Sequence, residues 1–327
     1  MINPKVKLAE KVLGKPDVAM TRDGFGKALL KLGETNPQVV ALCADLAEST
    51  RMLGFKEKYP DRFIEVGVAE QNLAAVASGL ANYGKIPFIA SYATFSPGRN
   101  NEQIRTTISL NNVPVKIVGS HAGLSVGPDG ATHQALEDIA LMRVQPNMTV
   151  ISPCDEEEAY KATLAAAEYP SPVYIRLARE KTPVITTEQT PFTIGKANLL
   201  WLGEHPQVVI MATGPLVHNA LLAAKKLEKT IEVSVINIHT IKPLDTKTIV
   251  AAAKAAGAVV TVEEHQVAGG LGSAIAEVLA QECPVPIEFV GVRDEFGQSG
   301  EPNELIEHYG MGVSTIVSAV KRALKRK

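Results

Sequence analysis

Residues 62–81 of the chain read RFIEVGVAEQNLAAVASGLA, and this stretch decides the fold of the first half of the protein. Its apolar start predicts a buried strand over 62–66, and Gly67 predicts a turn that leads into a helix over 70–83. Open parallel sheets bind their ligands at the carboxyl ends of the strands. The stretch therefore predicts that the carboxylate of Glu70 lies at a ligand-binding edge.

The same alternation of short apolar runs and helix-like stretches continues along the chain and predicts doubly wound α/β units with parallel sheets. The other strands predicted in the first half are 39–44, 86–91, 115–119, 148–152 and 173–177. The helices predicted there are 22–33, 99–110, 133–143 and 155–168. In the second half, the predicted strands are 208–212, 232–236, 258–262 and 287–292. The predicted helices of that half are 216–227, 245–256, 271–281 and 312–324.

The length of 327 residues predicts two domains, at about 150 residues each. A run rich in Thr and Pro at 181–196 is typical of an interdomain connector. We therefore expect an N-terminal arm over 1–16, a first domain over 17–181, a linker over 182–196 and a smaller second domain over 197–327.

Composition excludes several classes of function. The net charge of −2 argues against nucleic-acid binding, and no apolar run approaches the ~18 residues of a membrane span. The three cysteines form no CxxC pair, which argues against a zinc site or a disulfide framework. The first residues lack the apolar core of a signal peptide, so we expect a cytoplasmic protein.

Two interpretations of Glu70 are open from its position alone. An acid in the first turn of a helix stabilises the helix dipole. The same carboxylate could also bind a ring nitrogen of a cofactor and exchange a proton with it, and the small Gly67, Ala69 and Ala74 nearby would let a flat ring approach. The second interpretation predicts a thiamine diphosphate site, because that cofactor is activated through its aminopyrimidine ring.

The segment 119–134, GSHAGLSVGPDGATHQ, is a glycine-rich loop after a predicted strand. It carries His121, Asp129 and His133, a set that fits a metal site, a structural loop, or the recognition of a substrate rich in hydroxyl groups. We favour the third interpretation, because two imidazoles on such a loop lack a third fixed ligand nearby.

Further polar residues follow other predicted elements. Asp45 and Ser49 lie just beyond the strand predicted at 39–44, where Asp45 could bind a ligand or cap a turn. Arg22 and Arg179 could clamp a phosphate through paired hydrogen bonds, or be ordinary surface arginines. The GGLG sequence at 269–272 lacks the spacing of a dinucleotide-binding loop and predicts a tight helix start.

Five segments taken in order identify a family resemblance. They are TRDGFGKAL at 21–29, ADLAEST at 44–50, RFIEVGVAEQN at 62–72, HAGLSVGPDGATHQALED at 121–138 and VTVEEHQVAGGLGSAIAE at 260–277. From about residue 20 onward the chain resembles the C-terminal half of transketolases, and most of all the separate C-terminal subunit of split transketolases. The resemblance implies a pyrimidine-binding domain followed by a transketolase C-terminal domain.

The resemblance also implies roles for residues of the first domain. Those it implies in catalysis are Glu70, His121 and His133. Those it implies in cofactor binding are Glu70, Asp45, Leu46, Phe95 and Tyr92. Those it implies in binding the sugar phosphate are Arg22, Ser49, His121, Asp129, His133 and Arg179. The segment 92–99 is shorter than in long-chain transketolases and has fewer aromatic residues.

The chain lacks the GDG motif with which thiamine enzymes hold the metal ion of the diphosphate. The resemblance therefore implies a partner, an N-terminal subunit that binds the diphosphate and Mg²⁺ (or Ca²⁺ or Mn²⁺), in an α2β2 assembly, with no metal ligand in this chain. The implied activity is transfer of a two-carbon ketol unit between sugar phosphates through an enamine on the cofactor, as in the pentose phosphate pathway. The alternatives are the β subunit of a 2-oxo acid dehydrogenase E1, half of a deoxyxylulose-phosphate synthase, and a non-catalytic scaffold subunit.

Overall fold

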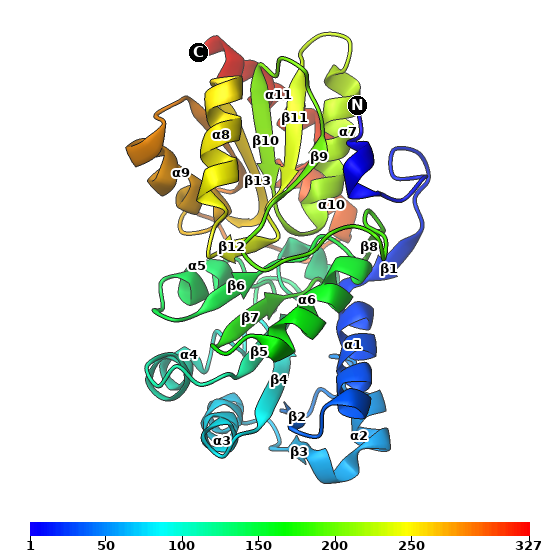
Figure 1. Ribbon diagram of the computed structural model, residues 1–327, viewed down its shortest axis with the longest axis vertical. Coiled ribbons are helices and arrows are strands. Elements are labelled where there is room, and N and C mark those ends of the chain that lie inside the picture. Colours follow the sequence, from blue (N-terminus) through cyan, green and yellow to red (C-terminus); the bar gives the residue numbers. More distant parts are fainter.

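The computed structural model describes residues 1–327 as two α/β units, one above the other in Figure 1. The first unit contains a seven-stranded sheet in the order β12-β6-β7-β5-β4-β2-β3, in which only β12 is antiparallel to its neighbour. Its strands are β2 (Val39–Cys43), β3 (Phe63–Glu65), β4 (Ile86–Tyr92), β5 (Lys116–Ser120), β6 (Thr149–Ile151), β7 (Val173–Arg176) and β12 (Thr240–Lys242). Their side chains are mostly buried on both faces, as expected for a parallel sheet between helices.

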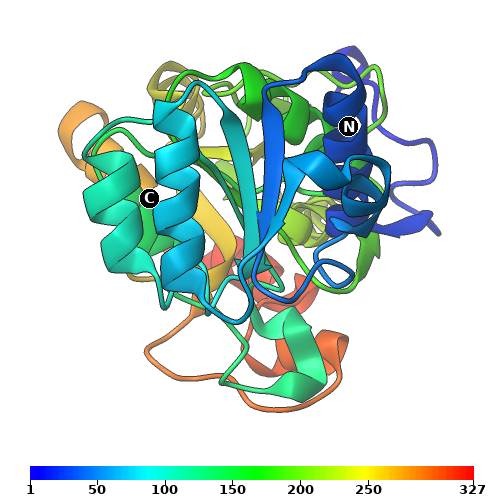
Figure 2. The ribbon, with the colours of Figure 1, turned by 90° about the horizontal axis from the view of Figure 1, so that it is seen from below.

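Helices cover both faces of this sheet. They are α1 (Thr21–Thr35), α2 (Leu53–Lys58), α3 (Glu70–Asn82), α4 (Asn101–Gln103), α5 (Asp138–Arg143) and α6 (Glu156–Glu168). On one face α1 packs against α6, where Gly24 lies so close to the backbone of Glu156 that no side chain would fit. On the other face α3 lies beside the helix formed by α4 and the π-helix η3 (Ile104–Ser109), as Figure 2 shows with α1 across the sheet.

The second unit contains a five-stranded sheet in the order β14-β13-β10-β11-β9, with only β9 antiparallel. Its strands are β9 (Asn198–Trp201), β10 (Val208–Ala212), β11 (Val233–Asn237), β13 (Val259–Gln266) and β14 (Ile287–Val292). Its helices are α7 (Val217–Leu227), α8 (Thr246–Ala256), α9 (Leu271–Glu282), α10 (Pro302–His308) and α11 (Val313–Lys325). Helices α7 and α11 share one apolar core with the sheet, and α8 and α9 contribute to another.

The predicted α/β fold is therefore confirmed, and two predicted helices differ from those observed. The helix predicted from His133 begins at Asp138, because Ala135 pairs with Ala122 in an isolated bridge and Gln134 turns its amide toward the preceding loop. The helix predicted over 99–110 is a short α4 followed by the π-helix η3. None of the helices in the structure is long and apolar enough to cross a membrane.

Three connections tie the two units together. The predicted arm packs on the second unit, where Val6 and Val12 are buried and the short η1 (Pro4–Val6) lies beside β9 (Figure 1). At the start of the predicted linker, β8 (Lys181–Pro183) spans the predicted boundary of the first domain and pairs with β1 (Val18–Met20). The strand β12, which lies between β11 and α8 in the sequence, joins the first sheet at the junction. These crossings fix the carboxyl edge of the first sheet against the second unit.

Candidate active site

The carboxyl edge of the first sheet carries most of the predicted site residues. Asp45 follows β2, Glu70 begins α3 just after β3, Tyr92 ends β4, His121 follows β5, and Arg179 lies three residues beyond β7. The strands β7, β5, β4, β2 and β3 are consecutive in the sheet. Residues far apart in sequence are thus brought to one edge.

Glu70 is buried at the first position of α3, with a side chain that is only 1% exposed. Arg99 donates a hydrogen bond of 2.6 Å from Nη1 to Oε2 of this carboxylate, and Asn100 donates one of 2.9 Å to the backbone oxygen of Glu70. No residue of the chain donates to Oε1. One carboxylate oxygen is therefore held and the other is available to a ligand.

Aromatic rings form a continuous cluster at the same edge. The rings of Tyr92 and His121 stack with centroids 3.8 Å apart, and Phe95 lies 5.9 Å from Tyr92 and 5.4 Å from His133. The guanidinium of Arg99 lies 4.8 Å from the centroid of Phe95 while it also holds Glu70. The structure therefore joins the buried carboxylate, His121 and His133 to one aromatic surface.

His121 is held on both sides of its ring. Its backbone has a φ of 55°, an uncommon conformation for a residue with a side chain, and it is buried. Arg22 Nη1 lies 3.2 Å from Nε2, and Ser120 Oγ lies 2.8 Å from Nδ1. Because Arg22 can only donate, we assign Nε2 as an acceptor and place the proton on Nδ1.

The charge state of His121 follows from the same surroundings. Burial, together with the nearby guanidinium groups of Arg22, Arg179 and Arg51, lowers the pKa of His121 to about 3. At neutral pH the ring is therefore uncharged, and the positive charge at this point belongs to the arginines. Such an arrangement suits a phosphate or another oxyanion.

The arginines are positioned by neighbouring backbone and side-chain groups. Arg22 Nη1 also donates a bond of 2.8 Å to the backbone oxygen of Ser49, which brings two further predicted residues together. Arg179 Nη1 donates one of 2.7 Å to the oxygen of Val126. Arg51, which sequence reasoning missed, pairs with Asp23 at 2.6 Å.

Three predicted residues lie outside this network. Asp45 is exposed with a φ of 59°, and its amide donates to Glu65 Oε1 at 2.7 Å. Leu46 is half-buried against the core beneath α1, and Asp129 is exposed at the end of η4 (Leu124–Asp129). No hydrogen bond, ion pair or ring contact joins the side chains of these three residues to the cluster of Glu70 and the histidines.

Arg99 and Asn100 were also missed by sequence reasoning. Both were placed in or near the start of a predicted helix, and a basic residue one turn beyond the YATF aromatic pair was the available signal. Their contacts with Glu70 depend on the turns at 93–100, which carry the chain from β4 back to the start of α3.

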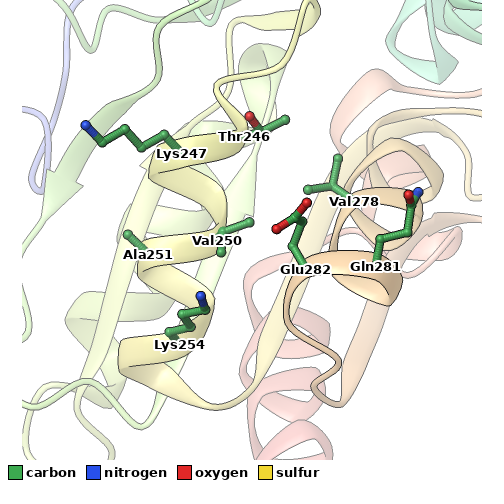
Figure 3. Close-up of a pocket in the computed structure, with 8 residues that line it drawn as sticks. All are labelled: Thr246, Lys247, Val250, Ala251, Lys254, Val278, Gln281 and Glu282. Carbon is green, nitrogen blue, oxygen red and sulfur yellow. The ribbon is translucent and has the colours of Figure 1, made fainter.

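Other candidate sites do not coincide with this edge. No group of three or more His, Cys, Asp or Glu side chains in the structure is arranged to hold a metal ion, and His121, Asp129 and His133 do not form such a group. A cavity of about 520 Å³ lies between α8 and α9 of the second unit (Figure 3). Its lining of short apolar and charged side chains includes none of the predicted site residues. The GGLG sequence begins α9, as predicted.

Comparisons with known proteins agree with this architecture. The transketolase pyrimidine-binding domain model matches residues 17–184, and the transketolase C-terminal domain model matches residues 195–316. The chain is 41% identical to the putative transketolase C-terminal section of Methanocaldococcus jannaschii, over 94% of this chain and 96% of that protein. It is 42% identical to the 6-deoxy-6-sulfo-D-fructose transketolase subunit SqwH of a Clostridium species, over 94% and 95% of the two chains.

Two solved structures are similar in fold. A split gene transketolase, described as an inactive beta4 tetramer, is 46% identical with a TM-score of 0.88, over 94% of this chain and 99% of that one. The transketolase of Campylobacter jejuni aligns with a TM-score of 0.81 over 98% of this chain and 49% of its own length, at 24% identity, which speaks to the fold alone. The chain therefore belongs to the transketolase family of thiamine-diphosphate-dependent transferases, among the C-terminal sections of split transketolases.

Proposed function

We propose that this chain is the C-terminal subunit of a two-polypeptide transketolase that transfers a two-carbon ketol unit between sugar phosphates. The observation that carries the proposal is the buried carboxylate of Glu70 beside an aromatic surface, with Oε2 held by Arg99 and Oε1 without a partner. A scaffold subunit has no need of a buried acid with an open oxygen, since such a group is costly to bury.

These residues fit the aminopyrimidine of thiamine diphosphate. Glu70 would hold a proton between Oε1 and a ring nitrogen, and Phe95 and Tyr92 would pack against the flat ring. Arg99 keeps the carboxylate in place from its outer side. When bound, the cofactor supplies a thiazolium carbon that becomes a nucleophile once deprotonated.

The arginine cluster supports a sugar phosphate as substrate. Arg22 Nη1 lies 3.2 Å from His121 Nε2, and Arg179 is among the charges that, after burial, lower the pKa of His121. The two guanidinium groups would bind the phosphate together. Neutral His121 would accept the hydrogen bond from Arg22 at Nε2 and so orient that guanidinium toward the anion. Half-buried His133, at the edge of the aromatic cluster, would exchange protons with sugar hydroxyl groups.

A partner polypeptide is part of the proposal. A diphosphate is normally neutralised by a divalent cation on oxygen ligands, and the chain has no GDG motif and no metal-binding group. The similar split gene transketolase is described as inactive when it forms a beta4 tetramer. We infer that an N-terminal subunit binds the diphosphate and Mg²⁺, and that two copies of each chain form the active enzyme.

The test is an assay of the purified chain with thiamine diphosphate, Mg²⁺ and a ketose phosphate donor plus an aldose phosphate acceptor, with and without the N-terminal subunit. We expect no turnover from this chain alone and turnover from the mixture. Full activity from the chain alone would refute the two-polypeptide assignment. A parallel reaction with a 6-deoxy-6-sulfo ketose tests whether the arginine cluster prefers phosphate, because guanidinium groups also bind sulfonate oxygens.

A further inference from the structure

The segment that carries Asp129 and His133 is a closed loop of the first unit, residues 122–135, which we name the substrate loop. Its two ends meet where Ala122 and Ala135 form a bridge and the amide of Gly123 donates to the oxygen of Ala135 at 2.9 Å. His121 immediately precedes the loop. The conformation of the loop therefore decides where these side chains lie relative to Glu70.

The second unit reaches into this loop through Glu264, near the end of β13. Its Oε1 accepts a hydrogen bond of 2.6 Å from the amide of Ser125, and its backbone oxygen accepts one of 2.8 Å from Arg176 of β7. Gly123 lies so close to the Glu264 carboxylate that a β-carbon there would collide with it. The carboxylate thus fits the inner wall of the substrate loop.

Glu264 is an unusual side chain to find in this position. It is 3% exposed and makes no ion pair within 4 Å, although burying a carboxylate is unfavourable unless hydrogen bonds or charges compensate. Burial raises the pKa of Glu264, and the charge of Arg176 and the hydrogen bond from the Ser125 amide partly offset that effect. An apolar residue would have filled the space at lower cost if packing were the only requirement.

The second unit also holds the loop from outside. Leu124 is fully buried in the core of the second unit, and Gln134 donates a 3.0 Å bond to the oxygen of Gln298. Ser299 lies beside Gly130, and α10 packs along η4. Figure 2 shows the green η4 segment beside the orange segment that precedes α10. The loop is therefore clamped between β13 and the 298–302 segment.

We propose that Glu264 is a positioning residue for the sugar site: it fixes the substrate loop through the Ser125 amide, so that the second domain sets the affinity for the sugar. The sugar-affinity part rests on the proposed function, whereas the fixing of the loop stands on the contacts alone. Glu264 would leave cofactor binding unchanged, because it touches none of the residues around Glu70.

The chain offers a matched control in Glu263. It is the preceding residue of the same strand, is equally buried, and also accepts backbone hydrogen bonds, from the amides of Leu271 and Gly272 at 2.6 and 2.8 Å. Those bonds hold the start of α9 and not the substrate loop. If both variants acted only by loosening the packing at the domain junction, Glu263→Ala and Glu264→Ala would affect the substrate loop to a similar extent. A positioning role predicts that only the change at Glu264 affects the loop.

The experiment compares Glu264→Ala, Glu264→Gln and Glu263→Ala by amide hydrogen exchange on the full chain. Loss of a buried acceptor leaves the Ser125 amide unpaired, so in Glu264→Ala we expect amides of 123–134 to exchange about 10- to 100-fold faster. Gln should restore protection, because its side-chain oxygen accepts the same bond. Glu263→Ala should change exchange at the start of α9 and leave 123–134 unchanged.

Kinetics of the reconstituted two-subunit enzyme give the second readout. In Glu264→Ala we expect the KM for the sugar phosphate to rise about tenfold with an unchanged dissociation constant for thiamine diphosphate, and Gln to recover the KM. Unchanged loop exchange in Glu264→Ala, or equal effects of Glu263→Ala on the loop, would overturn the proposal. If Glu264→Ala does not fold, Ser125→Pro removes the donor of the same hydrogen bond and should likewise speed amide exchange in the substrate loop. Absence of sugar turnover in the native pair would refute the proposed function only, since exchange still decides the fixing of the loop.

Discussion

Replacing Glu70 with Gln is the sharpest perturbation of the candidate site. The side chain is 1% exposed, and Gln keeps its size and can still accept the 2.6 Å bond from Arg99 Nη1. The change from a charged to a neutral acceptor should cost about 1 kcal/mol of stability or less, because Arg99 is 48% exposed and largely solvated. In a chain of 327 residues, that loss lowers the melting temperature by only about 2 °C.

The catalytic effect should be far larger. An amide at position 70 cannot exchange a proton with a ring nitrogen, and loss of a positioned acid or base typically costs about 100- to 10,000-fold in rate. The assay is ketol transfer by the reconstituted pair, with subunit association measured by sedimentation as a control for assembly. We expect turnover to fall by at least about 100-fold while association is unchanged. A variant that keeps about a tenth or more of the native turnover would refute the proposed role of Glu70.

Three further predictions concern the surroundings of the site and the domain junction. Arg99→Ala should loosen the Glu70 carboxylate and reduce thiamine diphosphate affinity more than Arg99→Lys does; titration by fluorescence checks this, and equal affinities for both variants would contradict it. Because the pKa of His121 falls from 6.5 to about 3 on folding, the unfolded chain binds more protons below pH 6.5, so stability is lost as pH falls from about 6.5 toward 3. When urea denaturation is measured across that pH range, the free energy of unfolding should fall less steeply with pH in His121→Asn than in the native protein. Parallel plots of stability against pH would argue against a neutral His121 ring. Asp155→Ala should lower the free energy of unfolding by about 3 kcal/mol, because the buried carboxylate accepts hydrogen bonds from three backbone amides and a hydroxyl group. Asp245→Ala should lower it by only about 1 kcal/mol, because Asp245 caps α8 at a more exposed position. Urea denaturation of the two variants compares these losses.

Much of the fold could be predicted because local patterns specify it. The strand predicted at 208–212 is β10 residue for residue, and the helix predicted from Glu70 begins there. Both follow from uninterrupted apolar runs or from a turn residue beside a helical repeat. The positions of Glu70, Tyr92 and His121 at one sheet edge follow from the same alternation, since parallel strands share their carboxyl ends.

The features that could not be predicted depend on contacts distant in sequence. The strand β12 belongs to the second half of the chain yet pairs with β6, and nothing within Thr240–Lys242 specifies that neighbour. The late start of α5 reflects the bridge from Ala135 to Ala122 and the hydrogen bonds of Gln134, which override a helical pattern.

Prediction of the site chemistry from sequence was limited for the same reason. The pairing of Arg99 with Glu70 depends on the turns after β4, and the low pKa of His121 depends on the burial of its ring and on three nearby arginines. Sequence patterns identify residue types at an edge, whereas the partner of each side chain is set by the packed fold. The substrate loop shows this most clearly, because its anchor Glu264 lies in another domain.

The most direct test of the account is a structure of the assembled pair of polypeptides with thiamine diphosphate bound. We predict that Oε1 of Glu70 lies within about 3 Å of a nitrogen of the aminopyrimidine ring, with Arg99 still on Oε2 and the diphosphate held by the partner. A carboxylate turned away from that ring, or a cofactor bound elsewhere, would contradict the account.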